Sequence, residues 1–188
     1  MIIAFHKPYG VLCQFTPDQP GQRTLSEFGF PKGVYPLGRL DMDSEGLLLL
    51  SDENGLNTRL LDPKNAHERT YLVQVEGEPS TEALEKLCSG AIVIQKHRCL
   101  PCRAKIPELQ KEIPPRVPPI RVRKSIPDTW IEITLIEGKN RQVRRMTAAI
   151  GYPTLRLVRI TIGAYTIGKL LFGEWKVISH AERKLIGI

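Results

Sequence analysis

Short apolar runs, separated by glycine, proline and charged residues, recur along the chain and predict β-strands. They have the length and the β-branched character of strands, and they occupy residues 2–5, 47–51, 70–76, 91–95, 129–136, 155–162 and 174–178. In one of them, Ile131, Ile133 and Leu135 alternate with Glu132 and Thr134. This alternation is typical of a strand with one buried face and one exposed face.

Fewer segments have helical signals. Ser80 is expected to cap a helix that ends at Gly90, and Asn140 to cap a second helix that ends before Gly151. A short helical turn is expected at 56–61. Strands outnumber helices, and several are joined too closely for the crossovers that parallel strands need. The sequence therefore predicts an α+β fold, with a mixed, mainly antiparallel sheet and helices packed against it.

The chain length and one unusual segment bear on domain organisation. A chain of 188 residues is long enough for one domain, 1–188, with a single core or two lobes. Residues 107–127 are rich in proline and in basic side chains. Because proline disfavours helices and central strands, this segment is expected to be an extended connection. It is either a surface loop or a cationic arm that follows a phosphate backbone, and the two descriptions are compatible.

The balance of charge indicates an anionic partner. The chain has 27 Lys+Arg against 20 Asp+Glu, a formal charge of +7, and nucleic acid is the commonest partner of a small basic protein. No apolar run approaches the roughly 20 residues that cross a bilayer, and the N-terminal residues lack the pattern of a signal peptide. We therefore expect a cytoplasmic protein that does not contact membranes and is a monomer.

The spacing Cys99-Leu100-Pro101-Cys102, with His97 just before it, occurs in metal and redox sites. A structural zinc site needs two clustered pairs of ligands, and Cys13 and Cys88 are isolated in the sequence. Reduced thiols in a turn are therefore favoured over a zinc or redox site.

An acidic segment precedes the apolar run at 47–51. Asp41, Asp43 and Glu45 resemble half of a calcium loop, but leucines follow where polar ligands would be needed, which disfavours calcium or magnesium. Two carboxylates at this spacing could instead form the acid/base pair of a glycosidase. Alternatively, Asp43 and Ser44 could form a turn that satisfies backbone donors before the strand begins. The residues alone do not separate the last two interpretations.

A basic segment at 137–151 is the second place where charged and apolar residues are interleaved. Arg141, Arg144 and Arg145 lie within about one helical turn, opposite Val143 and Met146. The helix dipole disfavours positive charge at a helix start, where a structural helix more often carries acids. The arginines either form a solvated basic face or bind phosphate, with one of them turned inward to hold a carboxylate ionised.

Together the two segments resemble the signature motifs of the RsuA-type rRNA pseudouridine synthases. Residues 38–50 match the family's Gly-Arg-Leu-Asp motif and the Asp-Ser-Glu-Gly-Leu-Leu that follows it. The segment around Tyr71 matches the family's Lys-Xaa-Tyr-Xaa-Val motif, with Thr70 in place of the basic residue. Residues 137–146 match the family's Glu-Gly-Xaa-Asn-Arg-Gln-Val-Arg-Arg-Met motif. The resemblance covers nearly the whole chain. It implies Asp41 as the essential carboxylate, Tyr71 as the active-site tyrosine, Arg144 as the partner of Asp41, and Leu155 as an apolar contact to the base.

The resemblance also implies the chemistry. The bond between ribose C1′ and uracil N1 breaks, the base turns, and C1′ bonds to C5, so neither a metal ion nor an organic cofactor is expected. Asp41 would add covalently to the sugar or the base, or act as a base on the sugar. Tyr71 would stack on the uracil and accept a proton near C5. Without the resemblance, Tyr71 on the same strand face as Val73 and Val75 would be interpreted as a core residue.

The implied substrate is ribosomal RNA, and the large-subunit branch of the family is the most similar. A uridine must leave its stack to reach Asp41, at a cost of a few kcal/mol. Basic residues are expected to offset that cost by binding phosphate, and Arg39 to bind phosphate or the flipped nucleotide; the phosphate contacts expected are Lys139, Arg141, Arg145 and Arg156. The match to the catalytic unit starts at the first residues of the sequence, so the S4-like RNA-binding domain of many members is not expected, and 107–127 could compensate in selecting the target.

Two other functions are compatible with the residues alone. A non-catalytic RNA-binding module would keep its role after Asp41→Ala. A metal-assisted hydrolase that uses Asp41, Asp43 and Glu45 would lose its activity to a chelator.

Overall fold

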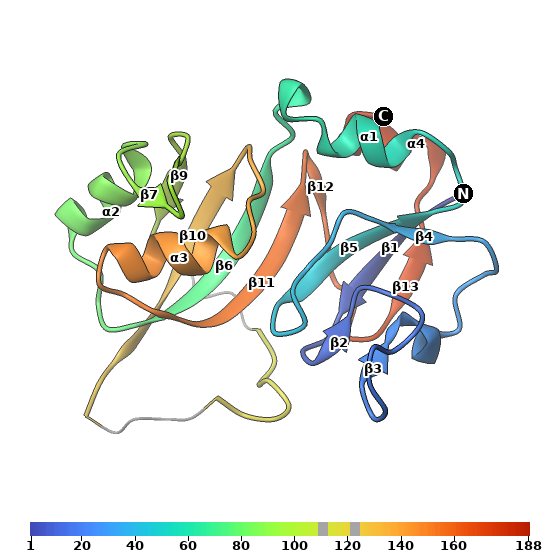
Figure 1. Ribbon diagram of the computed structural model, residues 1–188, viewed down its shortest axis with the longest axis horizontal. Coiled ribbons are helices and arrows are strands. Elements are labelled where there is room, and N and C mark those ends of the chain that lie inside the picture. Colours follow the sequence, from blue (N-terminus) through green and yellow to red (C-terminus); the bar gives the residue numbers. More distant parts are fainter. Residues whose placement is uncertain (109–112, 121–124) are drawn as a thin grey trace. The chain divides into compact units, whose positions relative to one another are not determined.

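The computed structural model describes residues 1–108, 113–120 and 125–188. Parts of the proline-rich segment predicted at 107–127 therefore lie outside the described residues. The chain forms two compact units: unit 1 comprises Met1–Arg69 and Val158–Ile188, and unit 2 comprises Thr70–Leu157. Each unit contains strands and helices of its own (Figure 1).

Unit 1 is built around β5 (Glu45–Ser51). The N-terminal strand β1 (Ile2–Lys7) pairs antiparallel with residues 46–51 of β5, and β13 (Trp175–Val177) pairs antiparallel with β1. On the other side of β5, β11 (Thr154–Ile162) runs parallel to it, with Val158 opposite Glu45. Short strands complete the unit: β4 (Tyr35–Leu37) pairs with β5, β12 (Tyr165–Thr166) with β11, and β2 (Val11–Leu12) with β3 (Arg23–Thr24).

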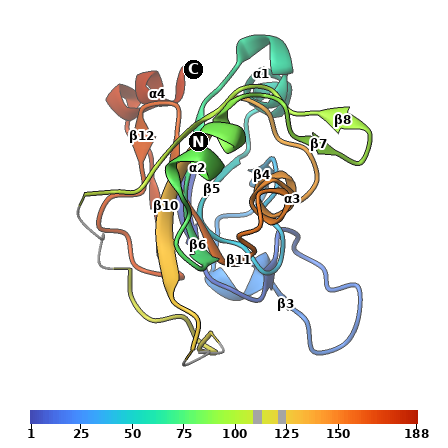
Figure 2. The same cartoon turned by 90° about the vertical axis from the view of Figure 1, so that its left-hand side faces the viewer.

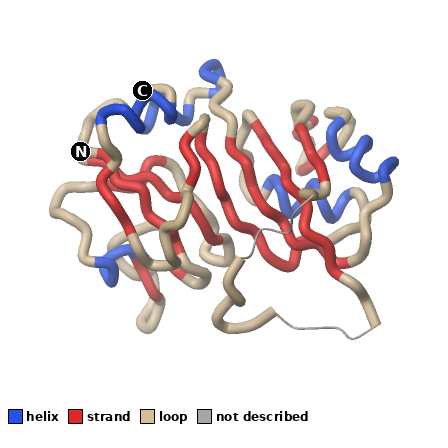
Figure 3. The backbone as a smooth tube through the Cα atoms, turned by 180° about the vertical axis from the view of Figure 1, so that it is seen from behind, coloured by secondary structure: helices blue, strands red, loops and turns tan. Residues whose placement is uncertain are grey.

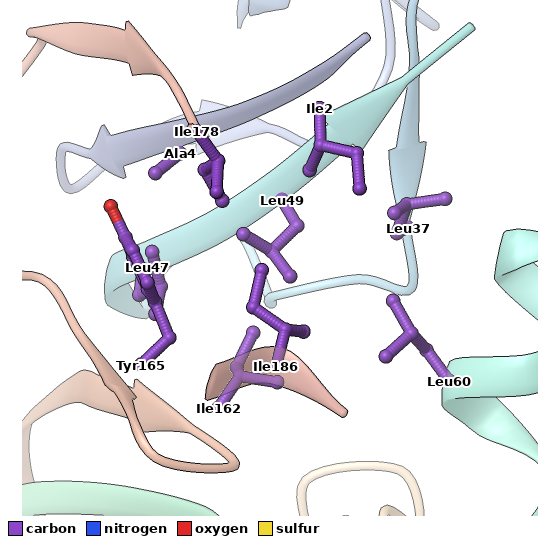
Figure 4. Packing of buried hydrophobic residues seen from close by; sticks show 10 residues of the cluster. All are labelled: Ile2, Ala4, Leu37, Leu47, Leu49, Leu60, Ile162, Tyr165, Ile178 and Ile186. Carbon is purple, nitrogen blue, oxygen red and sulfur yellow. The ribbon is translucent and has the colours of Figure 1, made fainter. Parts of the chain in front are cut away.

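Both faces of the unit 1 sheet are covered, which explains why its strands read as continuous apolar runs rather than alternating ones. Residues 47–50 of β5 are all fully buried. On one face, α1 (Leu56–Leu61) and α4 (His180–Ile186) contribute Leu60 and Ile186 to a cluster with Leu47 and Leu49 (Figure 4).

Aromatic side chains cover the other face of the unit 1 sheet. The ring of Phe5 lies 4.7 Å from that of Phe28, at the end of the 3₁₀ helix η1 (Leu25–Phe28), and 5.0 Å from that of Phe30. Trp175 of β13 lies 5.7 Å from Phe30 and donates its indole N–H to the Phe28 carbonyl at 2.9 Å. Strand β5 is therefore packed on both faces. The segment that leads into it, before Glu45, ends at a fixed point.

Unit 2 contains the strand order β11–β6–β10–β9, where β11 contributes its first residues. These strands are β6 (Arg69–Glu76), β10 (Asp128–Leu135) and β9 (Arg103–Lys105), and β7 (Val93–Ile94) forms a separate hairpin with β8 (His97–Arg98). Helix α2 (Thr81–Cys88) precedes that hairpin, and α3 (Gln142–Ala149) crosses one face of β6 and β10 (Figures 1 and 2).

The predicted α+β fold with a mainly antiparallel sheet is confirmed. The strands expected at 2–5, 47–51, 70–76, 129–136, 155–162 and 174–178 are present, with ends shifted by at most two residues, whereas the run at 91–95 gives only the short β7. Helix α1 matches its prediction. Ser80 caps α2 by accepting the N–H of Ala83 at 3.3 Å.

One cap was predicted wrongly. The N-cap of α3 is Arg141, in a left-handed conformation with φ 52°, and the side-chain oxygen of Asn140 accepts a bond from Arg145 instead. Helix α4 was not predicted. The helices are all short (blue in Figure 3), and within the described ranges none has the length and apolarity to span a bilayer.

Candidate active site

Asp41 lies in a tight turn that leads directly into β5. The N–H of Ser44 donates to the Asp41 carbonyl at 3.0 Å, and the N–H of Gly10 donates to the Met42 carbonyl at 2.8 Å. Leu40, just before Asp41, is buried, while Asp41 itself is half-buried. A turn was one of the two interpretations that the sequence left open, and it is present. It holds the backbone of Asp41 in place.

Lys7 holds the same turn from inside unit 1. Its side chain is fully buried at the end of β1, and its ammonium donates to the carbonyls of Val11, Pro8 and Met42 at 2.8, 3.0 and 3.4 Å. Burial lowers the pKa of Lys7 to about 8, and nearby acidic groups oppose this shift: Cys13, Glu45, Asp43 and Asp41. No role was predicted for Lys7, although a lysine at the end of a mainly apolar strand indicates a charge that needs partners.

The other residues of the acidic segment differ in exposure. Glu45 is buried at the start of β5, Asp43 is half-buried, and Arg39 is exposed. Throughout the described part of the chain, no three His, Cys, Asp or Glu side chains are grouped so that they could hold a metal ion.

In unit 2, Glu137 organises the segment that leads into α3. Its carboxylate accepts bonds from the side chains of Gln142 at 2.5 Å and His97 at 2.9 Å, and from the N–H of Leu100 at 2.8 Å. Burial would raise the pKa of Glu137, but these bonds outweigh it and hold that pKa below its ordinary value. Gln142 in turn accepts the N–H of Lys139 at 2.9 Å. The start of α3 is thus fixed by a buried carboxylate, and the sequence analysis gave Glu137 no role.

Within unit 2 the structure brings Arg144 to the end of β11 that carries Leu155. A side-chain nitrogen of Arg144 donates to the carbonyl of Thr154 at 3.5 Å, a long and weak bond. The hydroxyl of Thr147 on α3 bonds that of Thr154 at 2.7 Å and donates to the Arg144 carbonyl at 3.2 Å. Arg144, which the resemblance implies as the partner of Asp41, therefore lies next to the strand end that carries Leu155, the implied contact to the base.

The remaining basic residues of the predicted phosphate surface fall into two groups. Lys139 and Arg141 are exposed, and Arg145 is half-buried, where it bonds Gln95 and Asn140. Arg156 differs because it is only 3% exposed. Its guanidinium donates to the Pro114 carbonyl at 2.9 Å and lies over the ring of Trp130. A phosphate contact by Arg156 would therefore compete with bonds inside the protein.

Tyr71 lies on β6, in a row of buried residues that includes Val73 and Val75. The hydroxyls of Thr70 and Thr134 bond at 2.9 Å and hold β6 and β10 together next to it. The position of Tyr71 is therefore rigid. Its catalytic role stays a prediction.

The cysteines have the character of structural thiols. Cys99 is buried, and the thiol of Cys102 donates to the Leu87 carbonyl at 3.3 Å. Burial, together with Cys88, raises the pKa of Cys102 to about 12. Such a thiol is almost never the thiolate that attacks or binds metals.

Comparisons with known proteins identify the family of this chain. The family model of RNA pseudouridylate synthases matches residues 1–149. Ribosomal large subunit pseudouridine synthase E of Xanthomonas campestris is 51% identical over 94% of this chain and 95% of its own length. Ribosomal large subunit pseudouridine synthase B of Bacillus subtilis is 35% identical over 95% of this chain and 68% of its own length.

A solved structure leads to the same family. A crystal structure of a pseudouridylate synthase superposes with a TM-score of 0.80 at 25% identity, and the match covers 98% of this chain and 73% of that one. The resemblance read from the motifs, including its large-subunit branch, is confirmed by these matches. The chain therefore belongs to the RNA pseudouridylate synthase family, the enzymes that isomerise uridine to pseudouridine in RNA.

Proposed function

We propose that this protein isomerises a specific uridine of large-subunit ribosomal RNA, with Asp41 as the catalytic carboxylate. The observation that carries the substrate is the 51% identity, over nearly the whole of both chains, to a relative named for the large ribosomal subunit. The observation that supports Asp41 is the place of this half-buried residue on a turn whose backbone is bonded to Gly10 and Lys7. A rigid backbone below a reacting group lowers the entropy that catalysis must otherwise overcome.

In this proposal four residues form the active site. Three of them act on the flipped nucleotide, and Arg144 acts through Asp41. Asp41 acts at the sugar or the base, either as a nucleophile or as a base, while the C1′–N1 bond breaks and the C1′–C5 bond forms. Arg144 keeps the Asp41 carboxylate ionised during the reaction. Tyr71 stacks on the uracil and takes the proton from C5, and Leu155 contacts the base. The contact of Arg144 with the Thr154 carbonyl, next to Leu155, supports placing Arg144 and Leu155 at one site.

The RNA backbone is bound by the exposed basic side chains of both units. We assign phosphate contacts first to Arg39, Lys139 and Arg141, because these three side chains are exposed. Arg145 and Arg156 keep this role in the proposal, although their bonds inside unit 2 would have to be exchanged. The protein is proposed to act as a monomer, without a metal ion or organic cofactor, and in the cytoplasm, where bacterial ribosomal RNA is made.

The proposal is tested by mapping pseudouridines in ribosomal RNA from cells with and without this gene. The expected result is the loss of a single pseudouridine from the large-subunit RNA. It should return when the wild-type protein is expressed, and not when Asp41→Asn is expressed at the same level. An unchanged map would refute the proposed substrate, and rescue by Asp41→Asn would instead favour a non-catalytic RNA-binding role.

A further inference from the structure

A polar pocket of about 300 Å³ lies in unit 1, apart from the turn that carries Asp41. It is lined by Arg59, Asn65, His67 and Gly187. None of these residues belongs to the motifs that identify the family, and none has a place in the proposed reaction. The pocket therefore calls for an explanation of its own.

The fold builds this pocket from segments that are distant in sequence. Arg59 comes from the last turn of α1, Asn65 ends the 3₁₀ helix η2 (Pro63–Asn65), and Gly187 is the C-cap of α4. The Asn65 side chain donates to the Arg59 carbonyl at 2.6 Å, which fixes η2 against α1. Gly187 has φ 83°, and a Cβ there would lie 2.8 Å from the His67 ring. The imidazole is thus packed directly on the glycine.

Backbone bonds on both sides keep the pocket in shape. The N–H of Gly163 donates to the Glu68 carbonyl at 2.8 Å, and the N–H of Ala164 donates to the Leu185 carbonyl at 2.7 Å. These bonds connect the segment after β11 to the residue next to His67 and to the end of α4. The side chains of the pocket therefore rest on a preformed frame, as a binding site requires.

The charges at the pocket are positive. The pKa of His67 is lowered by burial and by the guanidinium groups of Arg69 and Arg59. Arg59 itself makes one long bond, 3.4 Å, to the Gly187 carbonyl, and a guanidinium has five N–H donors. A group that adds negative charge here would be attracted by the guanidinium groups and would favour the protonated form of His67. Phosphate, with several acceptor oxygens, is the chemical class that fits these donors best.

We propose that Arg59, His67 and Asn65 form a second phosphate-binding site, which takes a backbone phosphate of the RNA substrate. This inference rests on the proposed function, because it assumes that RNA is what the enzyme binds. It adds a contact that neither the family motifs nor the basic segment at 137–151 contains.

Helix α1 connects this site to the catalytic turn. The Asn57 side chain accepts the N–H of Gly38 at 2.9 Å, and a Cβ on Gly38 would lie 3.0 Å from the Leu61 side chain. Gly38 begins the segment that leads to Asp41. The helix that carries Arg59 therefore also contacts the start of that segment. A phosphate bound at Arg59 would be held by the same helix that positions the segment of the catalytic carboxylate.

The test follows the His67 ring by NMR in the full chain while either an RNA transcript of the target region or inorganic phosphate is added. With RNA, the His67 pKa should rise. Arg59→Gln and His67→Gln should each weaken RNA binding about threefold to tenfold at moderate salt, and Arg59→Gln should reduce the slope of log affinity against log salt by about 0.7–0.9. Lys32→Gln, which removes an exposed charge elsewhere in unit 1, is the matched control and should change binding less.

Two results would overturn the inference. One is a His67 ring that responds to inorganic phosphate and not to RNA, which would mean that the site takes a free anion. The other is RNA binding by Arg59→Gln and His67→Gln that equals that of Lys32→Gln. Pseudouridine formation by the wild-type protein is measured in the same samples. If the wild type makes pseudouridine and the variants bind normally, the second site is refuted and the proposed function stands.

Discussion

Lys7 carries its charge in a place where water cannot reach it. The lowering of its pKa from 10.5 to about 8 corresponds to about 3 kcal/mol by which burial, net of the opposing acidic groups, disfavours the charged form. The bonds to the Val11 and Met42 carbonyls depend on that charge for their strength. We interpret Lys7 as a positioning residue. Its buried charge lowers the stability of the fold and holds the turn of Asp41 in place.

This interpretation predicts that turnover falls as the pH rises through about 8, because neutral Lys7 holds the turn less firmly. Stability should move in the opposite direction. Between pH 8 and 10.5 the unfolded chain keeps the Lys7 proton and the folded chain releases it, so this group makes the fold more stable as the pH rises. The measurement is kcat with saturating RNA from pH 6.5 to 9.5, with thermal unfolding followed in the same buffers.

Lys7→Met is the control for this prediction, because it removes the titrating group and keeps most of the buried volume. Its kcat should be low and should lack the fall near pH 8. A wild-type kcat that stays level up to pH 9.5, or a fall that coincides with unfolding, would contradict the positioning role.

The residues of the site differ in how far the sequence could predict them. Asp41, Arg144 and Leu155 could be predicted only because the motifs around them resemble those of a known family, and their roles stay predictions. Lys7 and Glu137 were missed because their roles come from burial and from partners far away in the chain, such as Met42 for Lys7. A sequence shows the charge of such a residue, and only the fold shows that the charge is enclosed.

At the level of elements, the junction of β5 with β11 depends on Gly46. A Cβ at this position would lie 2.2 Å from the carbonyl oxygen and 2.6 Å from the nitrogen of Arg159, both backbone atoms. Gly46 also has φ 104°, which disfavours any other residue. Gly46→Ala should therefore cost more than about 3 kcal/mol, a loss found only where a backbone or a core must move.

Denaturant unfolding tests this prediction, with Gly33→Ala as the matched control. Gly33 has a similar positive φ of 85°, but a Cβ there would meet nothing within 4 Å. Gly33→Ala should lower the free energy of unfolding by only about 1 kcal/mol, the cost of a left-handed backbone conformation for a residue other than glycine. Equal losses in the two variants would show that the contact with Arg159 is unimportant.

The start of α3 depends in the same way on Glu137. Glu137→Gln replaces a charged acceptor of three bonds and should destabilise the protein by about 2 kcal/mol at neutral pH. Because the pKa of Glu137 is lowered in the folded protein, the wild type keeps this advantage above pH 4.5 and loses it as the pH falls through the folded value. Unfolding free energies of the two proteins should therefore converge in acid. A constant difference down to pH 3 would rule out the ionised carboxylate as its source.

Strands were predicted from the sequence better than helix ends were. Continuous apolar runs such as 47–50 leave little choice of element when both faces of a sheet are buried. The N-cap of α3 was misplaced because Asn140 is a favoured cap by residue type, whereas Glu137 and Gln142 fix the turn so that Arg141 takes the capping position. Tertiary bonds outweighed local preference there, and α4 was missed because its apolar face is short.

At the level of the whole molecule, we expect different basic residues to serve RNA binding and catalysis. Lys139→Ala removes an exposed charge and should weaken RNA binding, with a smaller salt dependence and an almost unchanged kcat. Arg144→Ala should lower kcat by on the order of 10²-fold, because its charge is needed in the transition state. Binding by gel shift at several salt concentrations, together with kcat, makes the comparison. Equal losses of binding in the two variants, with equal kcat, would contradict the separate roles.

The most direct test is to compare Asp41→Asn with the wild type in single-turnover reactions on a large-subunit RNA transcript. Asp43→Asn, two residues away on the same turn, is the matched control. With Asp41 as the catalytic carboxylate, Asp41→Asn should bind the RNA within about threefold of the wild type and form no pseudouridine above background, while Asp43→Asn retains activity. Pseudouridine formed by Asp41→Asn at a rate within about tenfold of the wild type would contradict the assignment.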